Sequence, residues 1–191
     1  MSDGVLSEFI DDAAERMAKS VESTRGEFTS VRTGRATPHL LDRVNVDYYG
    51  TFTPLRQLAQ VSASEARLLT ITPFDPGSIR AIEKAILESD VGLTPSNDGN
   101  LIRLTIPELT EERRRNLVRV VHGIAEQGRV SIRNVRRDTM QDLRELKKEG
   151  EVGSDDEHRA ETELQKLTDL RVADIDSLLA GKEEEIMGET Q

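Results

Sequence analysis

The 191-residue chain carries 26 basic and 36 acidic residues, which gives a net charge of −10. It has no cysteine, which excludes a disulfide framework, a thiolate zinc site and a cysteine nucleophile. No apolar run is long enough to cross a membrane, and the acidic N-terminal segment is unlike a signal peptide, so we expect a cytoplasmic protein that does not bind membranes.

The first segment predicts a long amphipathic helix from about residue 3 to residue 28 or beyond. Its apolar residues recur at spacings of three, four or their sums, which places them on one face of a helix. They are Leu6, Ile10, Ala13, Met17, Val21, Phe28 and Val31. A stripe of this length requires partner helices.

Residues 38–105 predict a small α+β domain. Alternating or β-branched residues make four short segments strand candidates. These are residues 44–48, 68–72, 91–94 and 101–106. Residues 97–99 read Asn-Asp-Gly, a hairpin-type turn between two of these candidates, and residues 78–88 predict one short helix.

The C-terminal half predicts two more long helices. The first starts after Pro107, with Thr110 as a plausible N-cap, and continues to Lys148. The second opens with a capping box at Ser154 and runs through Ile186. The short turn between them favours an antiparallel helical hairpin.

Burial of all three stripes predicts an α+β protein in which residues 1–31 and 109–191 form a three-helix bundle. Residues 38–105 are then an inserted domain, connected through residues 32–37 and 105–109. These two connections are candidate hinges, although ordinary loop chemistry also explains their glycine and prolines. The hinge candidates are Arg32, Gly34, Arg35, Pro38 and Pro107.

The charge is unevenly distributed. Residues 111–148 hold 11 basic and 6 acidic residues, whereas residues 149–191 hold 4 and 14. At 100° per residue, seven arginines share an arc of about 140°, with only Glu126 as an acid among them. We call these seven the arginine ridge: Arg114, Arg115, Arg119, Arg129, Arg133, Arg136 and Arg137. The apolar residues, Val120 among them, are expected on the opposite side.

The composition of the ridge favours binding to RNA or DNA phosphate. Arginine offers a planar fork that suits phosphate oxygens, and no lysine occurs between Arg113 and Arg137. So dense a positive cluster repels itself unless an anionic partner is present. The alternative is that these arginines pair with acids of a neighbouring helix and serve only solubility.

Nothing in the sequence indicates catalysis. The three histidines, His39, His122 and His158, lie far apart and match no metal-ligand spacing. There is no phosphate-binding glycine-rich loop and no nucleophile elbow. We therefore expect no catalytic residue, no metal ion and no cofactor.

Several segments together resemble one known family over essentially the whole chain. They are residues 31–38, 48–50, 53–59, 83–86, 89–93, 109–114, 130–138 and 164–169. In this order and spacing the chain is similar to ribosome recycling factors. The resemblance implies an L-shaped molecule, with a three-helix bundle and a smaller β/α/β domain. Phe52 departs from the pattern, since the family often has proline there.

The resemblance also implies a function without bond chemistry by the chain itself. Such a factor binds the post-termination ribosome between its subunits and splits them with elongation factor G, which hydrolyses GTP. By resemblance, Arg114, Arg133 and Arg136 contact large-subunit rRNA, with Arg129 and Arg137 adjacent. A monomer is the default expectation.

Two other readings remain open from the residues alone. One is a helical-hairpin adaptor that binds other helices through exposed apolar surface and has weak affinity for RNA. The other is an enzyme that uses a concave site in the small domain. Salt dependence separates RNA binding from apolar binding, because phosphate contacts weaken steeply with salt.

Overall fold

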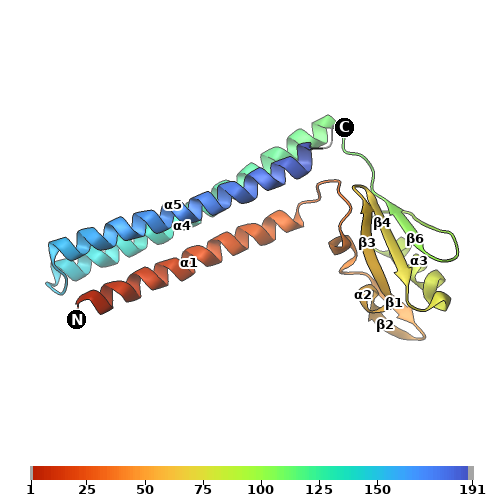
Figure 1. Ribbon diagram of the computed structural model, residues 1–191, viewed down its shortest axis with the longest axis horizontal. Coiled ribbons are helices and arrows are strands. Elements are labelled where there is room, and N and C mark those ends of the chain that lie inside the picture. Colours follow the sequence, from red (N-terminus) through yellow and green to blue (C-terminus); the bar gives the residue numbers. More distant parts are fainter. Residues whose placement is uncertain (1, 189–191) are drawn as a thin grey trace. The chain divides into compact units, whose positions relative to one another are not determined.

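The computed structural model describes residues 2–188 and divides the chain into two compact units. One unit combines the N-terminal residues through Arg32 with the chain from Glu111 onward, and the other comprises Thr33–Thr110. Each unit is described by itself below. The predicted α+β class is confirmed, with a helical bundle formed by the two ends of the chain and a mixed unit between them (Figure 1).

The bundle consists of α1 (Ser2–Ser30), α4 (Glu111–Lys148) and α5 (Ser154–Met187), and each helix contacts the other two (Figure 1). The apolar stripe predicted for α1 is buried from Leu6 to Phe28, which confirms the helical periodicity. Val31 lies beyond the end of the helix and is only half-buried. Alternating apolar residues of the other two helices complete this core.

The three helices approach most closely at Gly128 of α4. A Cβ atom at this position would lie 2.3 Å from Thr24 Oγ1 of α1 and 2.6 Å from Ile175 Cδ1 of α5. The absence of a side chain therefore lets the helices pack closely. By contrast, a Cβ atom on Gly123 of the same helix would meet no atom within 4 Å.

The connection between α4 and α5 differs in detail from its prediction. Gly153, not Ser154, is the N-cap of α5, and no side chain caps this end. Ser154 is the first helical residue, so the predicted capping box is wrong. Acidic residues do occupy the first turn, where they complement the helix dipole. Among them, buried Glu157 pairs with Lys147 of α4 and fastens the two helices together.

The mixed unit contains two antiparallel sheets. A hairpin pairs β1 (Asn45–Tyr48) with β2 (Thr51–Pro54). A four-stranded sheet has the order β3-β4-β6-β5, with every neighbouring pair antiparallel. Its strands are β3 (Ala59–Glu65), β4 (Leu68–Pro73), β5 (Pro95–Asn97) and β6 (Ile102–Thr105). Short helical turns connect them: η1 (Pro38–Leu41), α2 (Leu55–Leu58) and η2 (Pro76–Ser78).

The unit has a hydrophobic core of its own beneath α3 (Ile79–Glu88). Ile82 and Ile86 of α3 are fully buried, and the helix contacts β1 and β5. Buried leucine, isoleucine and valine side chains from both sheets complete this core. The predicted short helix is therefore confirmed, and its buried face holds the unit together.

The predicted strands are only partly right. Residues 91–94 form no strand, and the short strand β5 begins immediately after them at Pro95. Asp98 organises the turn that follows, since its carboxylate accepts hydrogen bonds from the amides of Asn100 (3.0 Å) and Leu101 (3.1 Å) and from Arg103 (2.8 Å). These donors, the two amides foremost, hold the pKa of Asp98 below its ordinary value.

Both tyrosines of the chain lie at the β1–β2 hairpin. Tyr49 and Gly50 occupy its turn with φ of 50° and 85°, the left-handed values that a tight two-residue hairpin requires. The Tyr48 hydroxyl donates to the Asp75 carboxylate at 3.1 Å, and this hydrogen bond raises the pKa of Tyr48. Asp75 thereby joins the hairpin to the start of η2, whose Gly77 amide it also accepts.

Candidate nucleic-acid interface

The arginine ridge runs along α4 beside the face that this helix buries in the bundle. The buried positions are Leu117, Val121, Ala125, Gly128, Ile132, Val135, Thr139 and Leu143. They alternate at spacings of three and four, as a bundle helix requires. Their centre is rotated from the predicted one, because Val120 is 50% exposed and Ile124 is only half-buried.

This rotation divides the ridge into two parts. Arg115, Arg119, Arg133 and Arg137 are exposed. Arg114, Arg129 and Arg136 are partly buried at the boundary of the bundle core. The sequence reading treated the seven side chains as one surface, whereas in the structure three of them border the packed interior.

Arg129 is bound within the bundle by two acids. Its Nε and Nη2 atoms donate to Asp176 Oδ1 of α5 at 2.9 and 2.6 Å, and its Nη1 donates to Glu126 at 3.2 Å. The side chain is only 18% exposed. The hydrogen bonds from Arg129 to Asp176, and then to Glu126, raise the pKa of the guanidinium, which stays charged.

Arg133 extends the same set of ion pairs toward solvent. Its Nη1 donates to the other oxygen of Glu126 at 3.0 Å, while the side chain remains 54% exposed. Asp176, Arg129, Glu126 and Arg133 therefore form a continuous series of charges, which we call the Glu126 network. Of the predicted alternatives for the ridge, pairing with a neighbouring helix describes Arg129, whereas Arg133 also presents its guanidinium to solvent.

The C-terminal part of the ridge is more open. Arg137 is exposed and lies 3.8 Å from the carboxylate of Asp138, which Arg16 of α1 also approaches at 3.3 Å. Arg136 is partly buried and forms no ion pair within residues 2–188. Arg133, Arg136 and Arg137 are close in sequence on one helix and face the same side, so they form a compact cationic surface.

We predict that the two arginines measurably acidify Glu126. Hydrogen bonds from Arg133, and then from Arg129, lower its pKa below the ordinary 4.5. Since the pKa is lower in the folded state, the network stabilises the bundle fully above the unfolded-state pKa and loses this effect as the pH falls through the folded-state value. Carboxyl 13C NMR titration should show a low midpoint, which Arg133→Ala moves upward.

The same titration has an internal comparison. Asp98 lies in the other unit and also has a lowered pKa, so Arg133→Ala should leave its midpoint unchanged. An unchanged Glu126 midpoint in Arg133→Ala would show that the ion pair does not form in solution.

The two connections between the units are tied to one turn of the small unit. The Ala36 amide donates to the Ala66 carbonyl oxygen at 2.7 Å, and the Ile106 amide donates to the Arg67 carbonyl oxygen at 2.8 Å. Ala66 and Arg67 form the turn between β3 and β4. The Arg67 side chain adds an ion pair to Glu108 at 3.4 Å.

Gly34 brings the two connections into direct contact. Its φ is 79°, and a Cβ atom there would lie 2.8 Å from Cγ of Leu109. Much of the predicted hinge therefore packs against the small unit, and the chain passes between the units at residues 32–33 and 110–111. Pro38 starts η1 behind the N-cap Thr37, whereas Pro107, Arg32 and Arg35 are exposed or half-exposed along the connections.

We predict that Gly34→Ala loosens this junction. The left-handed backbone and the displaced Leu109 side chain together should cost about 2–3 kcal/mol. Hydrogen exchange should then accelerate at the amides of Ala36 and Ile106. Leu109→Ala should cost less in the Gly34→Ala background than in the native chain, because it relieves the contact. Additive costs would show that Gly34 and Leu109 do not press on one another.

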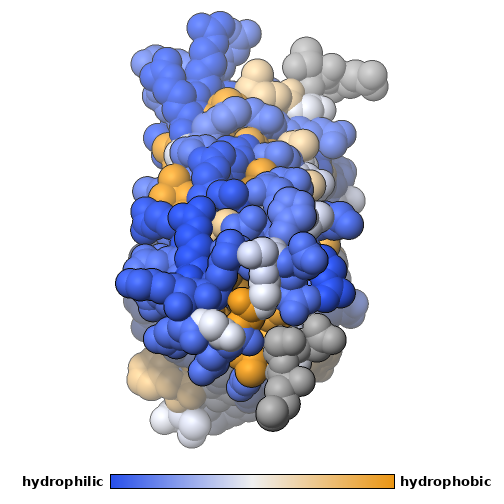
Figure 2. All heavy atoms as spheres, turned by 90° about the vertical axis from the view of Figure 1, so that its left-hand side faces the viewer, coloured by the Kyte–Doolittle hydropathy of each residue, from blue (hydrophilic) through white to orange (hydrophobic). Residues whose placement is uncertain are grey.

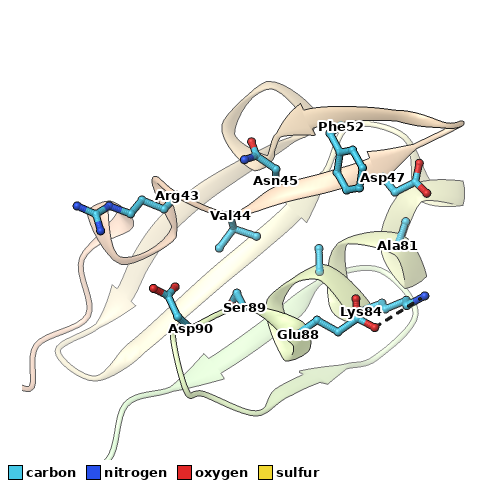
Figure 3. A pocket seen from close by; sticks show the side chains of 11 residues that line it. Arg43, Val44, Asn45, Asp47, Phe52, Ala81, Lys84, Glu88, Ser89 and Asp90 are labelled. Atoms are coloured by element: carbon cyan, nitrogen blue, oxygen red, sulfur yellow. Dashed lines mark ion pairs between the residues drawn. The ribbon is translucent and has the colours of Figure 1, made fainter.

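A groove of about 610 Å³ lies between the β1–β2 hairpin and α3 (Figure 3). Its charged residues have structural partners: Asp47 accepts the Gly50 amide at 2.9 Å, and Lys84 pairs with Glu88 at 3.8 Å along α3. Asp47 and Asp90 lie toward opposite ends of the groove, and exposed Phe52 lines the hairpin side (Figure 3). This arrangement does not provide the closely paired carboxylates of an acid–base site.

The histidines remain apart in the structure. His39 lies 3.0 Å from Asp42, His122 pairs with Glu183 of α5, and His158 lies 4.0 Å from Glu161. Each therefore has one acidic neighbour. No cluster of three or more metal-ligating side chains occurs in the described part of the chain.

Apolar side chains on the bundle surface are scattered. Val120 and Val130 are both exposed on α4, but ten residues separate them, or about 15 Å along the axis. Figure 2 shows one end of the bundle, where hydrophilic side chains predominate and the hydrophobic ones lie singly among them. None of the helices between residues 2 and 188 has the length and apolarity that a membrane crossing requires.

A model of one protein family matches residues 24–187, and that family is described as ribosome recycling factor. The chain belongs to the ribosome recycling factor family. Two bacterial ribosome-recycling factors show the same relationship at high identity. The one from Rubrobacter xylanophilus is 56% identical over 184 residues, covering 95% of this chain and 99% of the relative. The one from Desulforamulus reducens is 53% identical over 183 residues, with 96% and 99% covered.

Solved structures of ribosome recycling factors share the fold. A solution structure has a TM-score of 0.75 at 42% identity and covers 96% of this chain and 97% of its own. A second structure has a TM-score of 0.65 at 46% identity, with 96% and 99% covered. It presents the T. thermophilus ribosome recycling factor and the E. coli elongation factor G bound to the E. coli post-termination complex.

Proposed function

We propose that this ribosome recycling factor binds the post-termination ribosome between its subunits and splits them together with elongation factor G. The observation that carries the proposal is the exposed cationic surface of Arg133, Arg136 and Arg137 on a helix fixed within a bundle. Family membership and the relative described with a post-termination complex support the ribosome and elongation factor G as the partners.

In this proposal the ridge anchors the bundle to large-subunit rRNA. Arg114, Arg133, Arg136 and Arg137 make charge-assisted contacts with phosphate oxygens, for which the arginine fork is well suited. The strongly acidic remainder of the chain repels other nucleic-acid surfaces, which favours one oriented complex over non-specific binding. The role of Arg129 is different and is argued below.

The chain itself breaks no covalent bond in the proposed mechanism. The bundle acts as a stiff lever against the contacts between the subunits, and the small unit receives the force from elongation factor G. The hinge lies where the chain passes between the units, since residues on either side of these points are held by packing and hydrogen bonds. GTP hydrolysis by the partner supplies the energy, and the protein acts as a monomer in the cytoplasm.

Subunit splitting tests the proposal directly. Post-termination 70S ribosomes are mixed with this protein, elongation factor G and GTP, and dissociation is followed by light scattering and by sucrose-gradient sedimentation. We expect a fall in scattering only when all three are present, and no fall with a non-hydrolysable GTP analogue. A mixture that stays at 70S with every component present would overturn the proposed function.

A further inference from the structure

The Glu126 network assigns Arg129 a role different from that of its neighbours in the ridge. We propose that Arg129 is a positioning residue, which acts through Glu126 to hold the guanidinium of Arg133 ready for an RNA phosphate. This inference rests on the proposed function for the identity of the RNA, but the internal relation among the side chains is independent of it.

The geometry of Arg129 indicates a structural task. Three of its nitrogens donate to two carboxylates, one on its own helix and one on α5, and little of its side chain reaches solvent. A phosphate group at this guanidinium would have to displace Asp176 or Glu126 from a charge-assisted contact. Arg129 therefore faces its intramolecular partners.

Glu126 transmits this arrangement to Arg133. Its two oxygens are divided, with Oε2 accepting from Arg129 and Oε1 accepting from Arg133. Because both oxygens are engaged, the carboxylate is fixed in rotation, and Arg133 is restrained through one Nη atom while its remaining donors stay available. An arginine restrained in this way loses less conformational freedom when it binds phosphate.

The competing interpretation makes opposite predictions. If Arg129 contacts phosphate itself, its effect on binding adds to that of Arg133, and lysine replaces it adequately as a point charge. If Glu126 is only an acid in a cationic surface, Glu126→Gln strengthens RNA binding by removing repulsion. In our proposal, Glu126→Gln weakens binding although it makes the surface more positive.

The first test is a double-mutant cycle measured as binding to isolated large ribosomal subunits. We expect Arg129→Ala to weaken binding about 3- to 10-fold in the native background but less than about 2-fold in the Arg133→Ala background, since coupled residues are not additive. Arg129→Lys should remain weak, because an ammonium group does not reproduce the planar fork. Additive losses, or recovery in Arg129→Lys, would overturn the proposal.

The second test needs no ribosome. In 15N relaxation measurements of arginine Nε–H groups, Arg129→Ala should lower the order parameter of Arg133 and leave that of Arg137 unchanged. Arg171→Ala removes a partly buried arginine from an ion pair within α5, so it serves as the control for general loss of bundle stability. It should leave both order parameters unchanged.

These readouts separate the two levels of inference. If native protein fails to bind large subunits, the proposed function is wrong, and the relaxation data still decide the relation between Arg129 and Arg133. If native protein binds and the Arg133 order parameter is the same in Arg129→Ala, the positioning role is wrong and the RNA-binding proposal stands.

Discussion

Replacing Arg133 and Arg136 together with alanine is expected to weaken binding to isolated large ribosomal subunits by about 10²- to 10³-fold, since each hydrogen bond to a charged group contributes about 1.5–3 kcal/mol. Both side chains belong to the open part of the ridge. The slope of log Kd against log salt concentration should also become shallower by about 1–2, because each lost phosphate contact releases fewer counterions. Filter binding or sedimentation over a salt series measures both quantities.

A matched variant controls for net charge. Lys19→Ala combined with Arg25→Ala also removes two positive charges, but from α1, where each residue pairs with an acid of its own helix. This control should bind with nearly native affinity and an unchanged salt slope. If both double variants lose affinity equally, overall charge rather than the ridge governs binding. If neither does, the ridge is an ordinary solvated surface.

Replacing Gly128 with leucine is expected to lower the free energy of unfolding of the bundle by about 3 kcal/mol or more, because overpacking of a closed core site is poorly tolerated. Even the first carbon of the new side chain would overlap Thr24 and Ile175. The helices can accept leucine only by separating, which exposes the core on both sides of α4. Denaturant unfolding followed by far-ultraviolet circular dichroism measures the change.

Gly123→Leu is the control on the same helix. The space around Gly123 is open, so leucine there should stabilise α4 by about 0.5–1 kcal/mol through its higher helix propensity. The two substitutions are chemically identical and should have opposite signs. A stabilised Gly128→Leu would mean that the three helices do not meet closely at this level of the bundle.

The long helices were the most predictable part of the fold. Their apolar residues repeat over many turns, so an error in one position hardly alters the pattern. Buried positions such as Leu6, Met17 and Leu164 follow directly from the periodicity. The ends were less predictable, since the N-cap at Gly153 depends on backbone geometry that a neighbouring Ser154 does not reveal.

The small strands were harder to predict because several are polar. β3 is an edge strand, with serines and Gln60 facing solvent, and β2 has only one partner strand. Neither shows the apolar alternation of a half-buried strand. Residues 91–94 do show β-branched or apolar residues, but Val91 is buried by packing against the core rather than by strand pairing.

The sequence also located the arginine ridge without showing how its members differ. The partner of Arg129 is Asp176, which is 47 positions away and one of many acids in the last segment. Only packing of α4 against α5 identifies it. Likewise, nothing local predicts that Gly34 contacts Leu109, since this contact depends on how both connections fold onto one turn.

The placement of Tyr48 and Tyr49 gives the protein a built-in optical label. The chain has no tryptophan, and its only two tyrosines share one hairpin of the small unit. Tyrosine fluorescence therefore reports on that unit alone, while most of the helical circular dichroism comes from the bundle. Unfolding of the two units can thus be followed separately in the unmodified protein, and any difference between their midpoints gives the energetic coupling across the two connections.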